Sequence, residues 1–328
     1  MRSVERTTAL FGAGCSYGTL GLYRSSFPPL ARQFGSELVR RTRKSWNKKY
    51  AELAKVAAHL GKSLDTVSLE EIWTRIDYHA KFQGTFSKRW NTASAVTELK
   101  SALLQLYGRS CDRLATTLPL SRGYTLGRIL KEMKSGDTLI SLNYDTLVER
   151  LFGKRNNLRL LHCCGPPRTG VVRLLKPHGS ASWNLHDLGR NINDGEPSLE
   201  SLGRVSQQVE PLLLGAVPIK SELITEVQSH CRAPRVFEIV RNHWRGVADS
   251  IRDADRLVVV GYGFPQEDSY GRFFFAEGMR ERKNGHLLRI EFYELPEREG
   301  ITRCSIYEAF PGVSDVRYVG QVKAAPAR

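Results

Sequence analysis

The feature that most constrains the fold is a set of short apolar runs, each of which ends directly in a glycine or a polar turn. The clearest run spans Arg256 to Val260 and is followed by Gly261, and a second spans Thr7 to Phe11 and is followed by Gly12. Strands that are buried on both faces are nearly continuous apolar runs, whereas strands with one solvated face alternate. The runs therefore predict parallel strands covered on both sides.

Further strands and helices alternate along the chain. The expected strands are Thr138 to Leu142, Leu158 to Cys163, Val171 to Leu175, Leu212 to Val217, Arg289 to Leu295 and Val316 to Val319. The expected helices are Leu30 to Lys62, Leu69 to His79, Ala93 to Leu118, Leu126 to Lys134, Arg235 to Arg252 and Asp268 to Lys283. This order predicts an α/β fold, a Rossmann-like parallel sheet with helices on both faces.

The helical block from about 30 to 135 is too long for a simple crossover between two strands. It predicts a helical insertion after the first strand, within a single domain that covers residues 1–328. The segment from about 187 to 210 is rich in Gly, Asn, Asp and Ser, which predicts a flexible polar loop.

Charge is the one unusual property of the composition. The chain has 49 Lys and Arg against 34 Asp and Glu, a net charge of +15. Such an excess fits a polyanionic partner, an anionic ligand or a soluble surface. The densest basic stretch, residues 40–49, also contains Trp46 and lies next to Tyr50, so it is a candidate nucleic-acid contact. A solvated helix face is the favoured alternative.

The chain contains no long apolar run, and its first residues lack the apolar stretch of a secretion signal. We therefore expect a soluble cytoplasmic protein with no membrane contact. The six cysteines are scattered and form no Cys-x-x-Cys pair, so neither a disulfide framework nor a zinc site is expected. His162, Cys163 and Cys164 are adjacent, but core packing is favoured over a metal site there.

Three turns follow predicted strands and should meet at one edge of a parallel sheet, where ligands bind. The turn from Gly12 to Ser16 lets backbone N–H groups approach a phosphate, although an ordinary tight turn is an equal alternative. Asn143 and Asp145 follow the second strand, and helix capping is the favoured alternative for them. Gly261 opens the third turn. The sequence thus predicts a single ligand edge built from these turns.

Three further side chains have competing interpretations. His178 lies between Pro177 and Gly179 on a predicted loop, where a histidine is a candidate general base, although a lone histidine is more often structural. Tyr262 suits ring stacking or the core about equally. Helix capping accounts for Asp268.

Taken together, the segments Gly12 to Ser16, Asn143 to Asp145, His178-Gly179 and Gly261-Tyr262 resemble the sirtuin-like NAD-binding domain. The resemblance is closer to the branch found in bacterial defence systems than to protein deacylases. Three further matches support that branch: Pro28-Pro29-Leu30, Lys176 to Ser180 followed by Trp183, and Gly261 to Asp268. Gly263 departs from the family pattern, and the missing zinc cysteines argue against deacylation.

The resemblance implies an NAD+ glycohydrolase that cleaves the nicotinamide–ribose bond, with NAD as substrate and no zinc. Asn143 would orient water and ribose, and His178 would act as the base. The implied binding residues are Gly12, Ala13, Gly14 and Ser16 for the pyrophosphate, Asp145 for the nicotinamide amide, and Gly261 and Tyr262 for the adenosine side.

The resemblance also implies an antiviral defence effector that depletes NAD when triggered. Regulation would come from a homo-oligomer or from a partner such as a HerA-type ATPase or a short Argonaute. Two rival functions stay open: a nucleic-acid-binding or nuclease subunit of a defence complex, and an NAD-dependent ADP-ribosyl transferase or deacylase.

Overall fold

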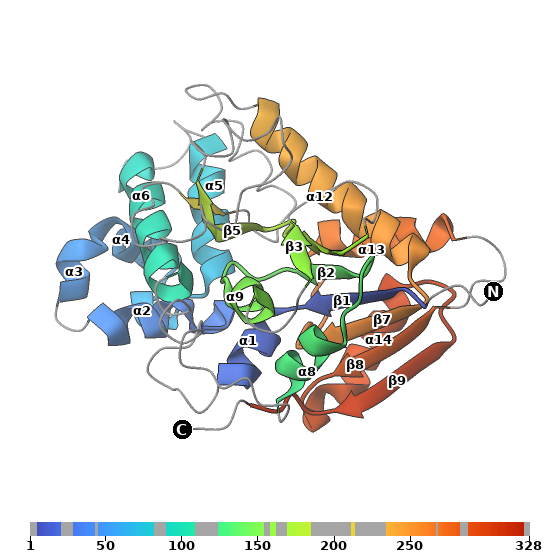
Figure 1. The fold of residues 1–328 in the computed structure, drawn as a ribbon. Coiled ribbons are helices and arrows are strands. Elements are labelled where there is room, and N and C mark those ends of the chain that lie inside the picture. Colours follow the sequence, from blue (N-terminus) through green and yellow to red (C-terminus); the bar gives the residue numbers. More distant parts are fainter. Residues whose placement is uncertain are drawn as a thin grey trace.

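The computed structural model describes residues 5–20, 29–42, 45–81, 90–108, 124–153, 158–161, 169–184, 211–213, 234–266, 268–282 and 288–324. Its centre is a seven-stranded sheet in the order β3-β4-β2-β1-β7-β8-β9, in which every neighbouring pair is parallel (Figure 1). The strands are β1 (Thr7–Phe11), β2 (Thr138–Ser141), β3 (Arg159–Leu161), β4 (Val171–Leu175), β7 (Arg256–Val260), β8 (Arg289–Tyr293) and β9 (Asp315–Gly320).

Helices cover both faces of this sheet because successive strand residues point to opposite sides. Ala9 and Phe11 of β1 join one core, and Leu10 joins the other. The first core is closed by α1 (Ala13–Leu20), α8 (Thr125–Glu132) and α9 (Leu147–Gly153). The second is closed by α12 (Pro234–Asp253), α13 (Ser269–Arg280) and α14 (Glu299–Ala309). The predicted Rossmann-like α/β fold is confirmed.

The helical insertion after the first strand is also present, between β1 and β2 (blue and cyan in Figure 1). It contains α2 (Phe34–Thr42), α3 (Trp46–Lys49), α4 (Ala51–His59), α5 (Leu69–Lys81), α6 (Thr92–Leu103) and a π-helical turn at Leu104–Gly108. These elements share a third core. The expected helix from Leu30 to Lys62 is broken into short pieces, since a continuous helix there would be about 50 Å long and could not fold back onto one core.

Helix α14 and strand β5 are among the described elements that the sequence did not predict. Helix α14 lies between β8 and β9, where a parallel pair requires a crossover. Strand β5 (Gly179–Asn184) pairs in antiparallel fashion with β6 (Pro211–Leu213), apart from the main sheet. The predicted polar loop at 187–210 and the pair Cys163 and Cys164 lie outside the described residues. Within the described ranges, no helix combines the length and apolarity that crossing a membrane requires.

Candidate functional site

The register of the sheet brings four strand ends to one edge. Phe11 at the end of β1 is level with Ser141 of β2 and with Val260 of β7. Ile140 of β2 is level with Leu175, the last residue of β4. The connections after β1 and β7 lead toward opposite ends of the sheet, and ligands of open α/β sheets bind at such a switch point. The segments that follow these strands therefore form the candidate site.

The two glycine turns pack directly on each other at this switch point. The backbone N–H of Gly14 donates to the carbonyl of Gly261 at 3.0 Å, and Gly261 has a φ of +60°. A Cβ on Gly12 would lie 2.5 Å from the Gly261 oxygen, and one on Gly14 would lie 2.9 Å from it. Both glycines are therefore required by the contact between turns.

This packing bears on the predicted phosphate role of the first turn. The N–H groups of Gly12 and Cys15 also donate internally, to Val260 at 3.0 Å and to Gly12 at 2.9 Å. Ala13 is exposed at the start of α1. The tight-turn alternative thus accounts for the glycines, and contact with a pyrophosphate stays a prediction.

A hydrogen-bond chain joins the first turn to the turn after β2. The Nδ2 of Asn143 donates to the carbonyl of Gly12 at 2.9 Å and to the Oγ of Ser16 at 3.0 Å, and this hydroxyl donates to Asp145 Oδ2 at 2.8 Å. All three side chains are buried. The Oδ1 of Asn143 finds no hydrogen-bond partner among the described residues. It is a buried acceptor that a ligand could satisfy.

Asp145 has a structural task in this arrangement. Its Oδ1 accepts the backbone N–H of Leu147, the first residue of α9, at 3.0 Å, in line with the capping alternative. Burial raises the pKa of the Asp145 carboxyl above its ordinary value, and the ammonium of Lys176 and the hydrogen bonds act against that rise. Both carboxyl oxygens have internal donors, so the proposed nicotinamide contact stays a prediction.

Beneath this turn lies a fully buried ion pair. Lys176, the residue after β4, donates from Nζ to the carbonyl of Asp145 at 2.5 Å and to Glu149 Oε1 at 2.8 Å. The two side chains are 0% and 1% exposed. A buried pair of charges is costly unless its geometry holds it closely. Since Lys176 Nζ also donates to the carbonyl of Asp145, it fixes the backbone of the turn that carries Asn143.

His178 enters the site from the turn between β4 and β5. Its Nδ1 lies 3.2 Å from the carbonyl of Leu142, the residue before Asn143, and its Nε2 lies 3.4 Å from Asp268 Oδ2. The ring is buried and meets Trp244 edge-on, with 5.6 Å between ring centroids. The Nε2 makes no contact that has hydrogen-bond geometry with a described residue. The two predicted catalytic residues are therefore neighbours, and each carries an unpaired polar atom.

Asp268 is the site residue that sequence reasoning assigned to capping alone. It does cap α13, since its Oδ1 accepts the N–H of Gly271 at 3.1 Å. Its Oδ2 also accepts from the hydroxyl of Tyr262 at 2.6 Å and faces His178. The segment Gly261 to Asp268 was the available signal, but nothing local in it indicates a histidine in the turn between β4 and β5.

Tyr262 belongs to the core rather than to an open stacking surface. Its ring packs edge-on against Phe264 and Phe275, with centroids 4.7 and 6.3 Å apart, and the residue is 7% exposed. Burial raises the pKa of its hydroxyl well above the ordinary value, and the charge of Asp268 adds to that rise. These contacts favour the structural alternative for the side chain.

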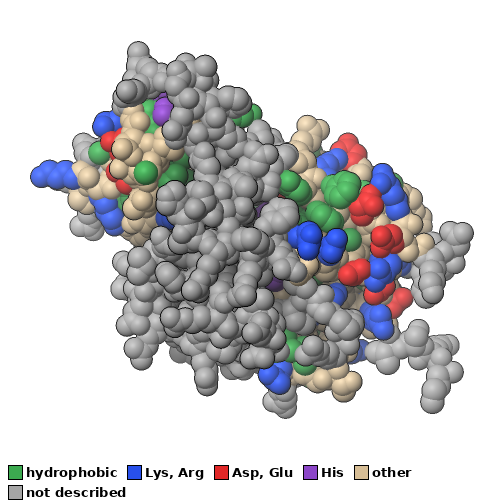
Figure 2. Space-filling view, turned by 90° about the horizontal axis from the view of Figure 1, so that it is seen from above, with side chains coloured by type: hydrophobic (Ala, Val, Ile, Leu, Met, Phe, Trp, Pro, Cys, Tyr) green, Lys and Arg blue, Asp and Glu red, His purple; other side chains and the backbone are tan. Residues whose placement is uncertain are grey.

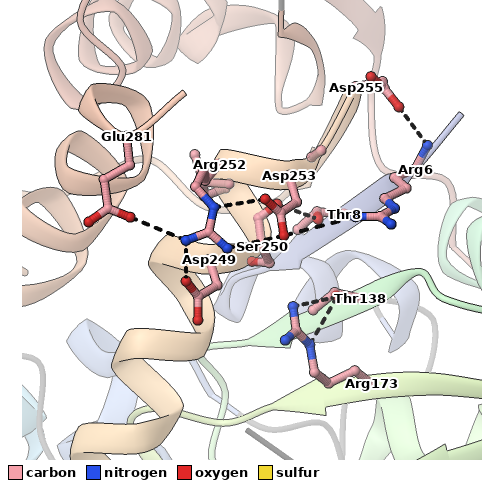
Figure 3. Close-up of polar contacts among 12 residues, drawn as sticks. Arg6, Thr8, Thr138, Arg173, Asp249, Ser250, Arg252, Asp253, Asp255 and Glu281 are labelled. Atoms are coloured by element: carbon pink, nitrogen blue, oxygen red, sulfur yellow. Dashed lines mark hydrogen bonds and ion pairs between the residues drawn. The ribbon is translucent and has the colours of Figure 1, made fainter. Parts of the chain in front are cut away.

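The opposite, amino edge of the sheet is closed by ion pairs (Figure 3). The guanidinium of Arg252 lies 2.7 Å from Asp249, 2.8 Å from Asp253 and 3.4 Å from Glu281. Nearby, the backbone N–H of Arg6 donates to Asp255 at 2.8 Å. Arg252 and the backbone of Arg6 thus find acidic partners at this edge, whereas the unpaired atoms of Asn143 and His178 lie at the carboxyl edge.

The described part of the basic stretch resembles a solvated helix face. Arg40 and Arg41 both pair with Glu37, at 2.6 and 3.2 Å, and Lys49 donates to Gln105 at 2.9 Å. On the face drawn in Figure 2, basic and acidic side chains of the described residues are interspersed most clearly at the right of the view, away from the inserted helices. Arg43 and Lys44 lie outside the described residues. These pairings favour the solvated-face alternative over a nucleic-acid contact.

The described residues hold no group of three or more His, Cys, Asp or Glu side chains arranged to bind a metal ion. No protein-family model matches the chain, and no curated protein matches it. The resemblance to sirtuin-like domains therefore rests on the four sequence motifs, and the geometry adds that their side chains meet at one edge of the sheet.

Proposed function

We propose that the protein is an NAD+ glycohydrolase in which Asn143 and His178 act on the ribose and on the attacking water. One observation carries this proposal: Asn143 Oδ1 and His178 Nε2 are buried polar atoms that lack a hydrogen-bond partner among the described residues. Such atoms cost about 1–3 kcal/mol each when they stay unpaired, so a ligand that pairs with them is favoured. An amide oxygen and a ring nitrogen are atoms that can pair with a hydroxyl group or a water molecule.

The reaction fits the limited acid chemistry of the site. The overall step is NAD+ plus water to ADP-ribose, nicotinamide and a proton. The bond between C1′ of the ribose and the nicotinamide nitrogen breaks, and its electron pair leaves with nicotinamide, which departs neutral without an acid. Most glycosidases need two carboxylates. Here Asp145 and Asp268 each accept hydrogen bonds from groups within the protein. A substrate whose leaving group is already cationic does not need either of them as an acid.

The two residues have separate tasks in this step. Asn143 is fixed by its Nδ2 bonds to Gly12 and Ser16, so its Oδ1 accepts a hydrogen bond from the water or from a ribose hydroxyl. His178, held through Nδ1 at the carbonyl of Leu142, takes the proton at Nε2. Orientation and general base catalysis together lower the barrier without a metal ion.

Purified protein incubated with NAD+ is expected to release nicotinamide and ADP-ribose, followed by chromatography. Both Asn143→Ala and His178→Ala are expected to lower kcat by at least about 100-fold, as loss of an orienting group or a general base does. His79→Ala in α5 and Asn91→Ala, directly before α6, are controls in the helical insertion, and they should retain the wild-type rate. Equal nicotinamide release by all five proteins, or none from the wild type with or without nucleic acid, would contradict the proposal.

A further inference from the structure

Asp268 makes more contacts than a helix cap requires. Capping α13 uses only Oδ1, which accepts the N–H of Gly271, and serine, threonine or asparagine performs that task equally well. The second oxygen instead accepts from Tyr262 and faces His178 Nε2, at 2.6 and 3.4 Å. The residue is 1% exposed. A buried carboxylate whose second oxygen faces a histidine from a distant turn calls for an explanation beyond the cap.

The partners of His178 indicate what that explanation is. Its Nδ1 faces a backbone carbonyl, which can only accept, so Nδ1 carries a proton in this contact. In a neutral ring the lone pair is then on Nε2, which lies 3.4 Å from Asp268 Oδ2 without hydrogen-bond geometry and so can accept a proton from water. Once Nε2 takes a proton, the same approach becomes an attractive ion pair. The positive charge that the ring gains when His178 acts as a base therefore lies next to a carboxylate.

We propose that Asp268 is a positioning residue that holds His178 and stabilises its ring after the ring takes a proton. This inference rests on the proposed function, in which that proton comes from the attacking water. The water O–H bond breaks, its oxygen bonds to C1′ of the ribose, the proton moves to His178 Nε2, and the nicotinamide leaves with the electron pair of the broken bond. Asp268 stays ionised throughout and touches no substrate. The proton later passes from His178 to solvent.

The electrostatics of Asp268 agree with that assignment. Burial by itself raises the pKa of its carboxyl. A positive charge on His178 and the hydrogen bonds from Tyr262 and the Gly271 N–H outweigh the burial, so the pKa lies below the ordinary value. The carboxylate is thus kept charged where His178 needs it. Trp244, which packs against the ring of His178, adds no charge.

The test compares Asp268→Asn with the wild type. Asparagine keeps an acceptor for Gly271 and a polar group for Tyr262, but it removes the charge. We expect kcat to fall by about 10- to 100-fold with KM for NAD+ changed less than threefold, because Asp268 acts through His178, whose own contribution is of the order of 10²–10⁴. A residue that only caps α13 would leave kcat unchanged, and an unchanged kcat would overturn the proposal.

Asp137→Asn is the matched control. Asp137 is also buried and accepts two backbone N–H groups, those of Thr7 at 2.9 Å and Lys134 at 2.7 Å, but it precedes β2 at the amino edge. Its replacement should lower the melting temperature and leave kcat unchanged. A similar fall in kcat for both variants would show a general loss of structure and would overturn the role of Asp268.

A second readout needs no enzymatic activity. The carboxyl carbon of Asp268 is followed by NMR in protein labelled at aspartate and is assigned by its absence from Asp268→Asn. In His178→Ala the carboxyl pKa should rise, because the neighbouring positive charge that lowers it is lost. An unchanged titration would overturn the pairing. If the pairing holds but the wild type cleaves no NAD+, the proposed function fails, the catalytic role of Asp268 fails with it, and the ion pair alone remains.

Discussion

Replacing Lys176 by methionine is expected to lower the free energy of unfolding by about 3–5 kcal/mol, since breaking a buried ion pair leaves an uncompensated charge. Lys176 and Glu149 are almost fully buried, and the Oε2 of Glu149 already lacks a hydrogen-bond partner among the described residues. The variant would leave both oxygens of Glu149 without the neighbouring ammonium. Urea unfolding followed by circular dichroism measures the loss.

Two further variants make this prediction specific. Lys176→Met combined with Glu149→Leu removes both charges and should recover most of the lost stability, because apolar replacement of a whole buried pair is often neutral or stabilising. Lys62→Met is the matched control: Lys62 pairs with Glu71 at 2.5 Å, but the side chains are 41% and 38% exposed, so it should cost at most about 1 kcal/mol. Equal losses for Lys176→Met and Lys62→Met would show that the buried pair is unimportant for stability.

The double variant also separates stability from activity. It lacks the bond from Lys176 Nζ to the carbonyl of Asp145, so the turn that carries Asn143 loses its support from below. We expect the recovered fold to cleave NAD+ more slowly than the wild type. Wild-type turnover in the double variant would show that the turn is held adequately by Ser16 and Gly12 alone.

Gly261→Ala is expected to cost about 2–5 kcal/mol and to abolish NAD+ cleavage. A left-handed backbone costs a non-glycine residue about 1–2 kcal/mol, and overpacking costs a further 1–3 kcal/mol, as an approximate range. Gly261 has a φ of +60°, and its new Cβ would lie 2.2 Å from the backbone nitrogen of Cys15 and 2.3 Å from the carbonyl carbon of Gly14. Only a shift of the whole first turn relieves that overlap, and Asn143 is bonded to this turn.

Gly312→Ala isolates the backbone contribution. Gly312 has a φ of +85°, but a Cβ added there would have no atom within 4 Å outside the adjacent residues, and Gly312 follows α14 away from the glycine turns. Its replacement should cost only about 1–2 kcal/mol and keep full activity. If Gly261→Ala were no more destabilising than Gly312→Ala, the close packing of the two glycine turns would be refuted.

Local sequence was sufficient for the strands of the central sheet. The run from Arg256 to Val260 is β7 to the residue, and Thr7 to Phe11 is β1, because a strand covered on both faces must be apolar throughout. Helix α14 escaped prediction because its sequence has a glycine at position 300, and Ile301 is 64% exposed. Its apolar periodicity is weak, and only the parallel pairing of β8 with β9 requires a helix there.

For the site, the sequence alone determined which residues follow the strand ends, since turn residues and apolar runs are local signals. Tertiary structure decided which of them meet. Lys176 pairs with Glu149, His178 faces Asp268, and Gly14 bonds to Gly261, because the order and register of the strands place distant segments side by side. That order is fixed by the packing of the whole sheet, and no short stretch of sequence encodes it.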